Sequence, residues 1–250
     1  MDLYNAIISR KSVRSFENRP IPKDVLCDIL EYAKSATPLE ESIGVGIELV
    51  ECSKKTFGAP YYIVIYSEEK EGYAQNAGYI MQRIVMYLVS MGLGTCYKMK
   101  NQALANKDAR GRKKVISVAF GYTKQATFRN PLEAKRLTWD ELCIVKEEPC
   151  DNVYKLIEAI RLSPSAYNSQ PWRMVVYQNC LHLYVCKKAH FQKEFVKYID
   201  IGIARANLDM AAANQWIDIS KRYIEKLETK GGKRFEYVIS VKHVADNLIQ

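Results

Sequence analysis

Hydrophobic positions along the chain follow two periods, and each period predicts its own set of elements. Apolar residues three and four apart indicate amphipathic helices, whereas short apolar or alternating runs indicate strands. Helices are predicted at about 2–9, 23–36, 73–91, 151–162 and 198–216. Strands are predicted at 61–66, 114–120, 172–177, 181–185 and 234–241. Because helices and strands interleave, the chain belongs to the α+β or α/β class.

The order of these elements repeats in the second half of the chain. The helix predicted at 151–162 resembles the segment 24–35 in length and apolar spacing, and Gly202 in the last long helix matches Gly78 in the first. We therefore predict an internal duplication within one compact unit, with halves at 1–146 and 147–250 and a linker near 147–150.

The two halves differ in their polar motifs. Only the first half contains RKSVR at 10–14 and GLGT at 92–95, and only the second contains SPSAYNSQPW at 163–172. The matching place in the first half is SATPL at 35–39. Each half thus lacks the motifs that the other half has kept. This predicts that the two halves share one site per chain.

Composition narrows the functional class. With 48% hydrophobic and 26% charged residues the sequence has ordinary globular values. No apolar stretch is long enough for a membrane span, and the start lacks a signal-peptide pattern, so we expect a soluble cytoplasmic protein. Seven scattered cysteines without Cys-x-x-Cys, and three histidines, favour neither a disulfide framework nor a metal site.

The net charge of +9 suits an anionic partner such as a nucleic acid, a membrane surface or a phosphorylated cofactor. The segment 10–14 has three cations and a hydroxyl that can bracket one phosphate, although short basic turns are also common. The amides of 168–170 suit the edge of a heteroaromatic ring, or simply cap a loop that leads Trp172 into the core. The segment 92–95 indicates a helix C-cap rather than a dinucleotide-binding turn.

Together these motifs resemble the FMN-dependent nitroreductase family. The matching pieces are RKSVRSF at 10–16, MGLGTCY at 91–97, FGY with KRL at 120–122 and 135–137, and SPSAYNSQPWRMVV at 163–176. In ordinary members the last motif precedes GLGT, and two identical subunits share each flavin site. The order here resembles a branch in which one chain holds two fused, diverged copies. The resemblance implies an α+β nitroreductase-like fold built as an intramolecular pseudo-dimer.

The resemblance also implies a set of FMN contacts. The basic segments at 10–14 and 135–136 match the residues that hold the FMN phosphate in the family. The loop after the helix predicted at 151–162 matches the loop from the other subunit, and the stretch after GLGT matches the backbone beside flavin N5. Members often have small residues in that stretch, where this chain has YKMK at 97–100. The implied residues are Arg10, Lys11, Ser12, Arg14, Tyr97, Lys98, Met99, Lys135, Arg136, Pro164, Ser165, Ala166 and Asn168.

The implied chemistry is hydride transfer from NAD(P)H through FMN to a nitroaromatic, a quinone or a similar small acceptor. The flavin carries this chemistry, so no catalytic side chain and no metal are expected. A monomer is expected because both sides of the site lie in one chain. The alternatives are a flavin protein of the same fold with other chemistry, such as dehalogenation or oxidation, or with no turnover. A basic nucleic-acid-binding protein is a more remote alternative.

Overall fold

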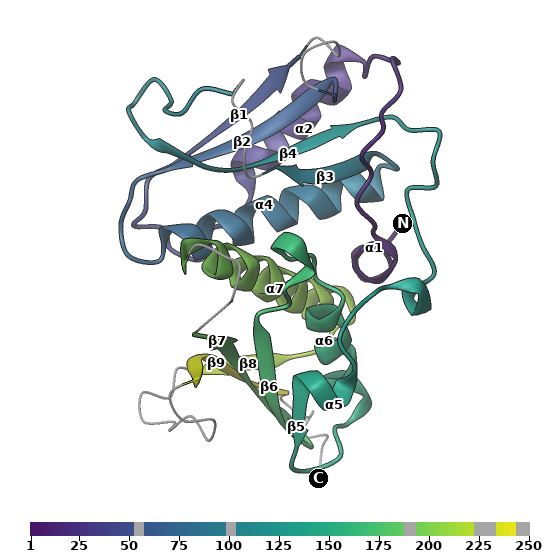
Figure 1. Cartoon of the computed structure of the whole chain (residues 1–250), viewed down its shortest axis with the longest axis vertical. Helices are drawn as coiled ribbons and strands as arrows, with labels where there is room; N and C mark the ends of the chain where they lie inside the picture. Colours follow the sequence, from purple (N-terminus) through teal and green to yellow (C-terminus); the bar gives the residue numbers. More distant parts are fainter. Residues whose placement is uncertain (53–57, 99–103, 188–193, 223–233, 244–250) are drawn as a thin grey trace.

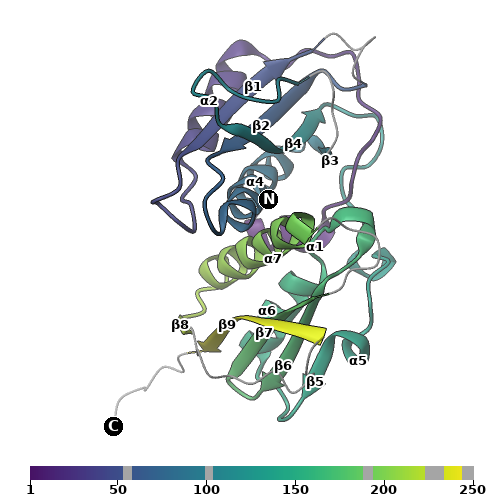
Figure 2. The same cartoon turned by 60° about the vertical axis from the view of Figure 1, so that its left-hand side comes forward.

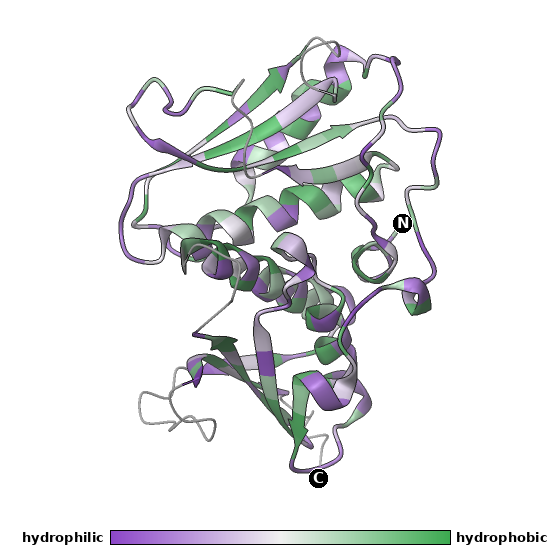
Figure 3. Ribbon diagram, viewed as in Figure 1, coloured by the Kyte–Doolittle hydropathy of each residue, from purple (hydrophilic) through white to green (hydrophobic). Residues whose placement is uncertain are grey.

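The computed structural model describes residues 1–52, 58–98, 104–187, 194–222 and 234–243. Two β-sheets form the outer layers, and two long helices, α4 (Tyr73–Ser90) and α7 (Glu194–Asn214), cross between them (Figures 1 and 2). The hydrophobic core lies where these helices pack on each other and on the inner faces of both sheets. Figure 3 shows hydrophobic residues along the strands and on both long helices.

The first sheet is antiparallel throughout, in the order β1-β2-β4-β3. Its central strand β2 is buried along its whole length, which explains its continuous apolar sequence. The helix α2 packs on both β1 and α4. The bounds are α2 Lys23–Ser35, β1 Val45–Glu51, β2 Tyr61–Ser67, β3 Gly94–Lys98 and β4 Lys113–Gly121.

The second sheet repeats this order as β6-β7-β9-β8 and adds one strand, β5, parallel to β6. The helix α6 takes the place of α2 before the first strand of the repeat. The bounds are β5 Cys143–Val145, α6 Asp151–Arg161, β6 Trp172–Tyr177, β7 Cys180–Cys186, β8 Ile219–Arg222 and β9 Phe235–His243. The α+β fold and the internal duplication predicted from the sequence are therefore confirmed.

The two long helices approach closely because each carries a glycine at the crossing. A Cβ atom added to Gly78 would lie 2.2 Å from the carbonyl oxygen of Ile199, and one added to Gly202 would lie 2.0 Å from that of Gln75. Gly202 lies 124 residues after Gly78, and Ile199 lies 124 residues after Gln75. The contact is thus reciprocal, as in an interface between two subunits related by a twofold axis.

The chain leaves the first sheet after β4 and descends beside the second half (Figure 1). On the way it forms a 3₁₀ turn, η1 (Pro131–Glu133), and the short helix α5 (Trp139–Leu142) before β5 joins the second sheet. The N-terminal helix α1 (Leu3–Ser9) contacts α4, α6 and α7. The predicted boundary at residue 146 follows the sequence repeat, whereas the chain passes to the second sheet before it.

Candidate functional site

The RKSVR segment lies between the descending chain and β3. Arg10 is the C-cap of α1 and forms a β-bridge with Phe128, while Ser12 bridges Thr95 at the start of β3. The amide of Val13 donates to the carbonyl of Thr95 at 2.9 Å. The GLGT motif therefore has two roles: its first glycine ends α4 in the left-handed region, as predicted for a C-cap, and its last two residues begin a strand that holds the basic segment.

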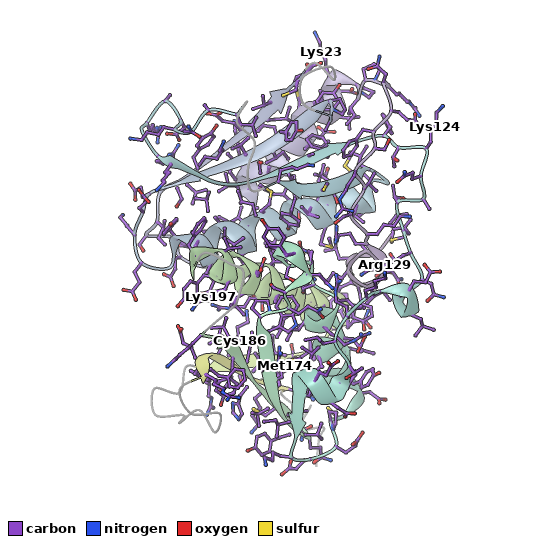
Figure 4. The ribbon with its side chains drawn as sticks, in the orientation of Figure 1. Lys23, Lys124, Arg129, Met174, Cys186 and Lys197 are labelled. Carbon is purple, nitrogen blue, oxygen red and sulfur yellow. The ribbon has the colours of Figure 1, made fainter. Side chains whose placement is uncertain are left out.

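Three arginines from separate parts of the chain gather at this place. Arg10 is only 3% exposed, and Arg129 and Arg136 on the descending chain are half-buried. Several of their buried N–H groups have no hydrogen-bond partner among the described residues: Nη1 of Arg10, Nε and Nη2 of Arg129, and Nε of Arg136. Figure 4 labels Arg129 beside α1, where its amide donates to the carbonyl of Ser9 at 2.8 Å.

The electrostatics of this arginine cluster are unfavourable for the protein alone. Burial, with a smaller contribution from the nearby charge of Arg129, lowers the pKa of Arg10 to about 10. Burial likewise lowers the pKa of Arg136 to about 10, with further contributions from Arg129, Arg10 and Arg161. All three guanidinium groups remain cations at neutral pH. A bound anion would reduce the repulsion between these buried cations and accept hydrogen bonds from their unpartnered N–H groups.

The SPSAYNSQPW loop reaches this cluster from the second half. The side chain of Arg136 donates to Oδ1 of Asn168 at 2.7 Å, and the amide of Asn168 donates to the carbonyl of Lys135 at 2.9 Å. Tyr167 and Asn168 have φ values of 55° and 57°. Non-glycine residues seldom adopt this left-handed region outside constrained or functional loops, although Asn tolerates it better than Tyr.

A buried chain of hydrogen bonds joins the loop to β3. The phenol of Tyr97 donates to Gln82 on α4 at 2.5 Å, and the amide of Gln82 donates to Asn207 on α7 at 2.7 Å. Asn207 donates in turn to the hydroxyl of Ser163 at 2.8 Å. Burial raises the pKa of Tyr97 well above its usual value, so its hydroxyl stays protonated as the donor. The two sides of the site are therefore connected through both long helices.

The loop is also fixed by an aspartate of α7. The carboxylate of Asp200, which is 2% exposed, accepts the amide of Ala166 at 3.1 and 3.2 Å. The charge of Asp200 contributes to raising the pKa of Tyr97, which indicates that the two groups lie close together.

The remaining predicted residues vary in burial. Pro164 is buried, whereas Lys11, Ser12, Lys98, Ser165 and Ala166 are half-buried, and Arg14 and Lys135 are exposed. Met99 lies outside the described residues. Three surface pockets, of about 200, 430 and 460 Å³, are lined by other residues than these. Of the predicted residues, the structure brings Arg10, Lys135, Arg136 and Asn168 together at the arginine cluster, while contacts with a flavin stay a prediction.

Sequence reasoning missed Arg129 and Thr95. Arg129 stands in TFRNP at 127–131, outside every motif, and is brought to the site only by the bridge between Arg10 and Phe128. The hydroxyl of Thr95 is buried and has no partner among the described residues. The one available signal was its place in GLGT. Within the described ranges, no three His, Cys, Asp or Glu side chains are grouped to hold a metal ion, and no helix is long and apolar enough to cross a bilayer.

Comparison with known proteins agrees with this architecture. A family model described as "Putative TM nitroreductase" matches residues 2–212. The chain belongs to this nitroreductase family. The crystal structure of a putative nitroreductase from Thermotoga maritima has a TM-score of 0.66 and 21% identity, over 97% of this chain and 94% of that one. It shows that the nitroreductase fold spans nearly the whole chain.

Two further solved structures match about half of this chain. A nitroreductase family protein from Clostridium novyi NT is 22% identical over 50% of this chain and 88% of that chain, with a TM-score of 0.43. An FMN-dependent nitroreductase from Clostridium difficile R20291 is 17% identical over 55% and 96%, with a TM-score of 0.41. Comparison with curated proteins finds no match.

Proposed function

We propose that this nitroreductase binds one FMN per chain at the arginine cluster and uses it to oxidise NAD(P)H. The observation that carries the proposal is the set of buried, unpartnered N–H groups on Arg10, Arg129 and Arg136. A phosphate dianion offers oxygens to several guanidinium groups at once, which fits this donor set. The motifs that resemble the FMN-dependent members of the family surround the same cluster.

Residues from both halves of the chain would contact the cofactor. Arg10, Arg129 and Arg136 would hold the phosphate, with Arg14, Lys11 and Lys135 at the rim. Ser12, Lys98 and Met99 would lie along the ring from the first half, and Pro164, Ser165, Ala166 and Asn168 from the second. Because Arg136 already bonds Asn168 across the halves, the site is organised before the cofactor binds.

FMN, when bound, supplies the chemistry: it takes a hydride from NAD(P)H and passes the electrons to a small acceptor such as a quinone or a nitroaromatic. The chain contributes binding, orientation and charge. The arginine cluster anchors the phosphate end, and the loop 163–170 positions the second half against the ring. Tyr97 keeps its proton and orders Gln82 and Asn207, so it acts on the geometry rather than as a general acid.

A single chain supplies both sides of the site, so we propose that a monomer is active. The reciprocal crossing of α4 and α7 stands where a subunit interface would lie in a dimer. The cytoplasmic location expected from the sequence stays part of the same proposal, because free thiols and a nicotinamide cofactor suit a reducing compartment.

The activity is tested with the purified full chain loaded with FMN. The oxidation of NADH and of NADPH is followed at their absorbance maximum, with a quinone and then a nitroaromatic as acceptor, and with excess FMN removed. The proposal predicts turnover that requires both flavin and acceptor. Flavin binding without NAD(P)H oxidation would instead support the second candidate, a flavin protein with other chemistry. The side chain of Tyr97, which stands where relatives often have small residues, favours that candidate.

A further inference from the structure

A second cluster of reactive side chains consists of Cys150, Asn152 and His243, none of which belongs to the arginine cluster. Sγ of Cys150 is 3.8 Å from Nδ1 of His243, and the side-chain amide nitrogen of Asn152 is 3.0 Å from Nε2 of the same ring. A thiol, an imidazole and an amide in this order are the parts of a nucleophile, its base and the group that orients the base. For Nδ1 to accept the thiol proton, Nε2 must carry the ring proton and the Asn152 amide must turn its oxygen to that nitrogen, an exchange of the amide nitrogen and oxygen that keeps the same contact.

The backbone holds the members of this cluster in place. The amide of Cys150 donates to the carbonyl of Gln178 at 2.9 Å, and the amide of His243 donates to that of Asn179 at 2.8 Å. Residues 178 and 179 form the turn between β6 and β7, so one hairpin turn aligns the linker with the last residue of β9. The arrangement therefore depends on the fold rather than on two mobile side chains that meet by chance.

Cys150 is also the N-cap of α6, and its side chain makes no capping hydrogen bond. The sulfur faces His243 beside the helix end, where free backbone N–H groups and the helix dipole favour a negative charge. A thiolate is the nucleophilic form of cysteine, and both a neighbouring imidazole and a helix N-terminus stabilise it.

The other cysteines lack this environment. Burial raises the pKa of Cys143 to about 12 and also raises the pKa of Cys52, Cys180 and Cys186. Cys96 is buried, and its thiol faces the carbonyl of Tyr97. Cys27 on α2 is the one exposed cysteine in the described part of the chain, and the structure gives it no imidazole neighbour there. Cys27 is therefore the more accessible thiol, whereas Cys150 is the one beside an imidazole.

We propose that Cys150 is a nucleophilic thiol that exchanges with small disulfides, with His243 as its base and Asn152 as the residue that orients the base. His243 takes the thiol proton as Sγ attacks one sulfur of the disulfide. The Cys150–sulfur bond forms, the bond between the two sulfurs of the small disulfide breaks, and the leaving thiolate receives the proton from His243. The products are a mixed disulfide on Cys150 and one free small thiol.

The experiment measures thiol–disulfide exchange in the folded full chain. An aromatic disulfide with a coloured leaving group is mixed in excess with the protein at neutral pH, and modified cysteines are located by peptide mass analysis. The proposal predicts that Cys150 reacts first, at least about tenfold faster than Cys27. The fast phase should disappear in Cys150→Ser and persist in Cys27→Ser, which serves as the matched control.

Two further measurements test whether the neighbours of Cys150 cause its faster reaction with the disulfide. His243→Gln keeps the thiol and the helix end but removes the base, so the fast phase should slow about tenfold while circular dichroism remains unchanged. In denaturant, Cys150 and Cys27 should react at similar rates. The proposal is overturned if Cys27 reacts as fast as Cys150 in the native chain, or if folded His243→Gln reacts like the original protein. None of these readouts requires FMN, so the result is independent of the proposed oxidoreductase activity.

Discussion

The two junctions between the halves share one framework and differ in how their charges are neutralised. On one side, Asp200 of α7 accepts the loop amide of Ala166; on the other, Asn76 of α4 accepts the amides of Leu39 and Glu40 at 2.8 and 3.2 Å. Asp200 lies 124 residues after Asn76, the same spacing that relates the two glycines of the helix crossing. Both loops are thus fixed by equivalent residues.

The two junctions differ in the charges that surround their arginines. At the arginine cluster, the cations mainly meet other arginines. At the opposite junction, Arg205 faces the charges of Asp209 and Glu40, and Asp209 also accepts Lys221 at 2.6 Å. At the opposite junction carboxylates lie near the cations, although the buried Nε of Arg83, beside Tyr79, has no partner among the described residues. The arginine cluster instead leaves four buried N–H groups for an outside anion. Equivalent positions of the duplicated scaffold therefore carry different charges, and the arginine cluster is the place that we propose for a phosphate.

The shared framework can be broken at the glycine crossing, where we expect the largest effect. Gly78→Ala and Gly202→Ala should each lower the free energy of unfolding by about 1–3 kcal/mol, because the new Cβ meets a backbone carbonyl and the helices must separate. Urea unfolding measures this loss. Gly44→Ala is the control, since its Cβ meets only the flexible end of Glu68. A large loss for one crossing glycine and none for the other would contradict the reciprocal contact.

The charge difference is sharpened by one matched pair of variants. Arg129→Gln should weaken FMN binding by about 2 kcal/mol, or roughly 30-fold, because it removes unpartnered donors from the phosphate site. Arg205→Gln, at the opposite junction, should leave FMN affinity unchanged. Fluorescence titration with FMN and with riboflavin measures both. Riboflavin has no phosphate, so its affinity should not respond to Arg129→Gln; equal losses for both flavins would remove Arg129 from the phosphate site.

The contribution of the second half is tested at Asn168. Asn168→Gly keeps the left-handed backbone but removes the amide that bonds Arg136 and Lys135. We expect FMN affinity to fall by about 1 kcal/mol, or roughly fivefold, because Arg136 loses a partner that positions it. Unchanged affinity in the same titration would mean that the loop does not help to form the site.

A smaller difference between the halves concerns pH. His182 pairs with Ser240 in the second sheet, one position before the bulge, where the first sheet pairs Val64 with Ser117. Burial lowers the pKa of His182, so the unfolded chain binds the proton more readily than the folded one. Stability should therefore fall as pH drops through about 6.5 and level off below the folded pKa. The midpoint of urea unfolding, measured over this pH range, should show this decrease in the original protein and not in His182→Gln.

Much of the fold could be predicted from periodicity. The long helix predicted at 73–91 is α4 at Tyr73–Ser90, and the hairpin at 172–185 is β6 and β7. The helix predicted at 198–216 begins four residues earlier, at Glu194. The strands β1, β3, β5 and β8 were not predicted, and β8 has only four residues. β1 has two glycines nearby, β3 follows a turn directly, and β5 has three residues, so none has a periodic pattern of sufficient length.

The site was predictable only as far as its motifs extend. The segments 10–14 and 163–172 both reach the arginine cluster, the first through Arg10 and the second through the hydrogen bond between Asn168 and Arg136. Arg129 carries no local signal, and its role arises from a bridge between residues more than 100 positions apart. The series of hydrogen bonds from Tyr97 through Gln82 and Asn207 to Ser163 could not be predicted from the sequence either, because it depends on the packing of α4 against α7.

The most direct test of the single shared site is the stoichiometry of FMN. Purified chain of known concentration is titrated with FMN, and bound flavin is counted from the visible absorption after removal of the free cofactor. The account predicts one FMN per chain, with binding lost in a protein that lacks both Arg10 and Arg129 but remains folded. Two FMN molecules per chain would show that both junctions hold the cofactor, and no binding would contradict the assignment of the arginine cluster.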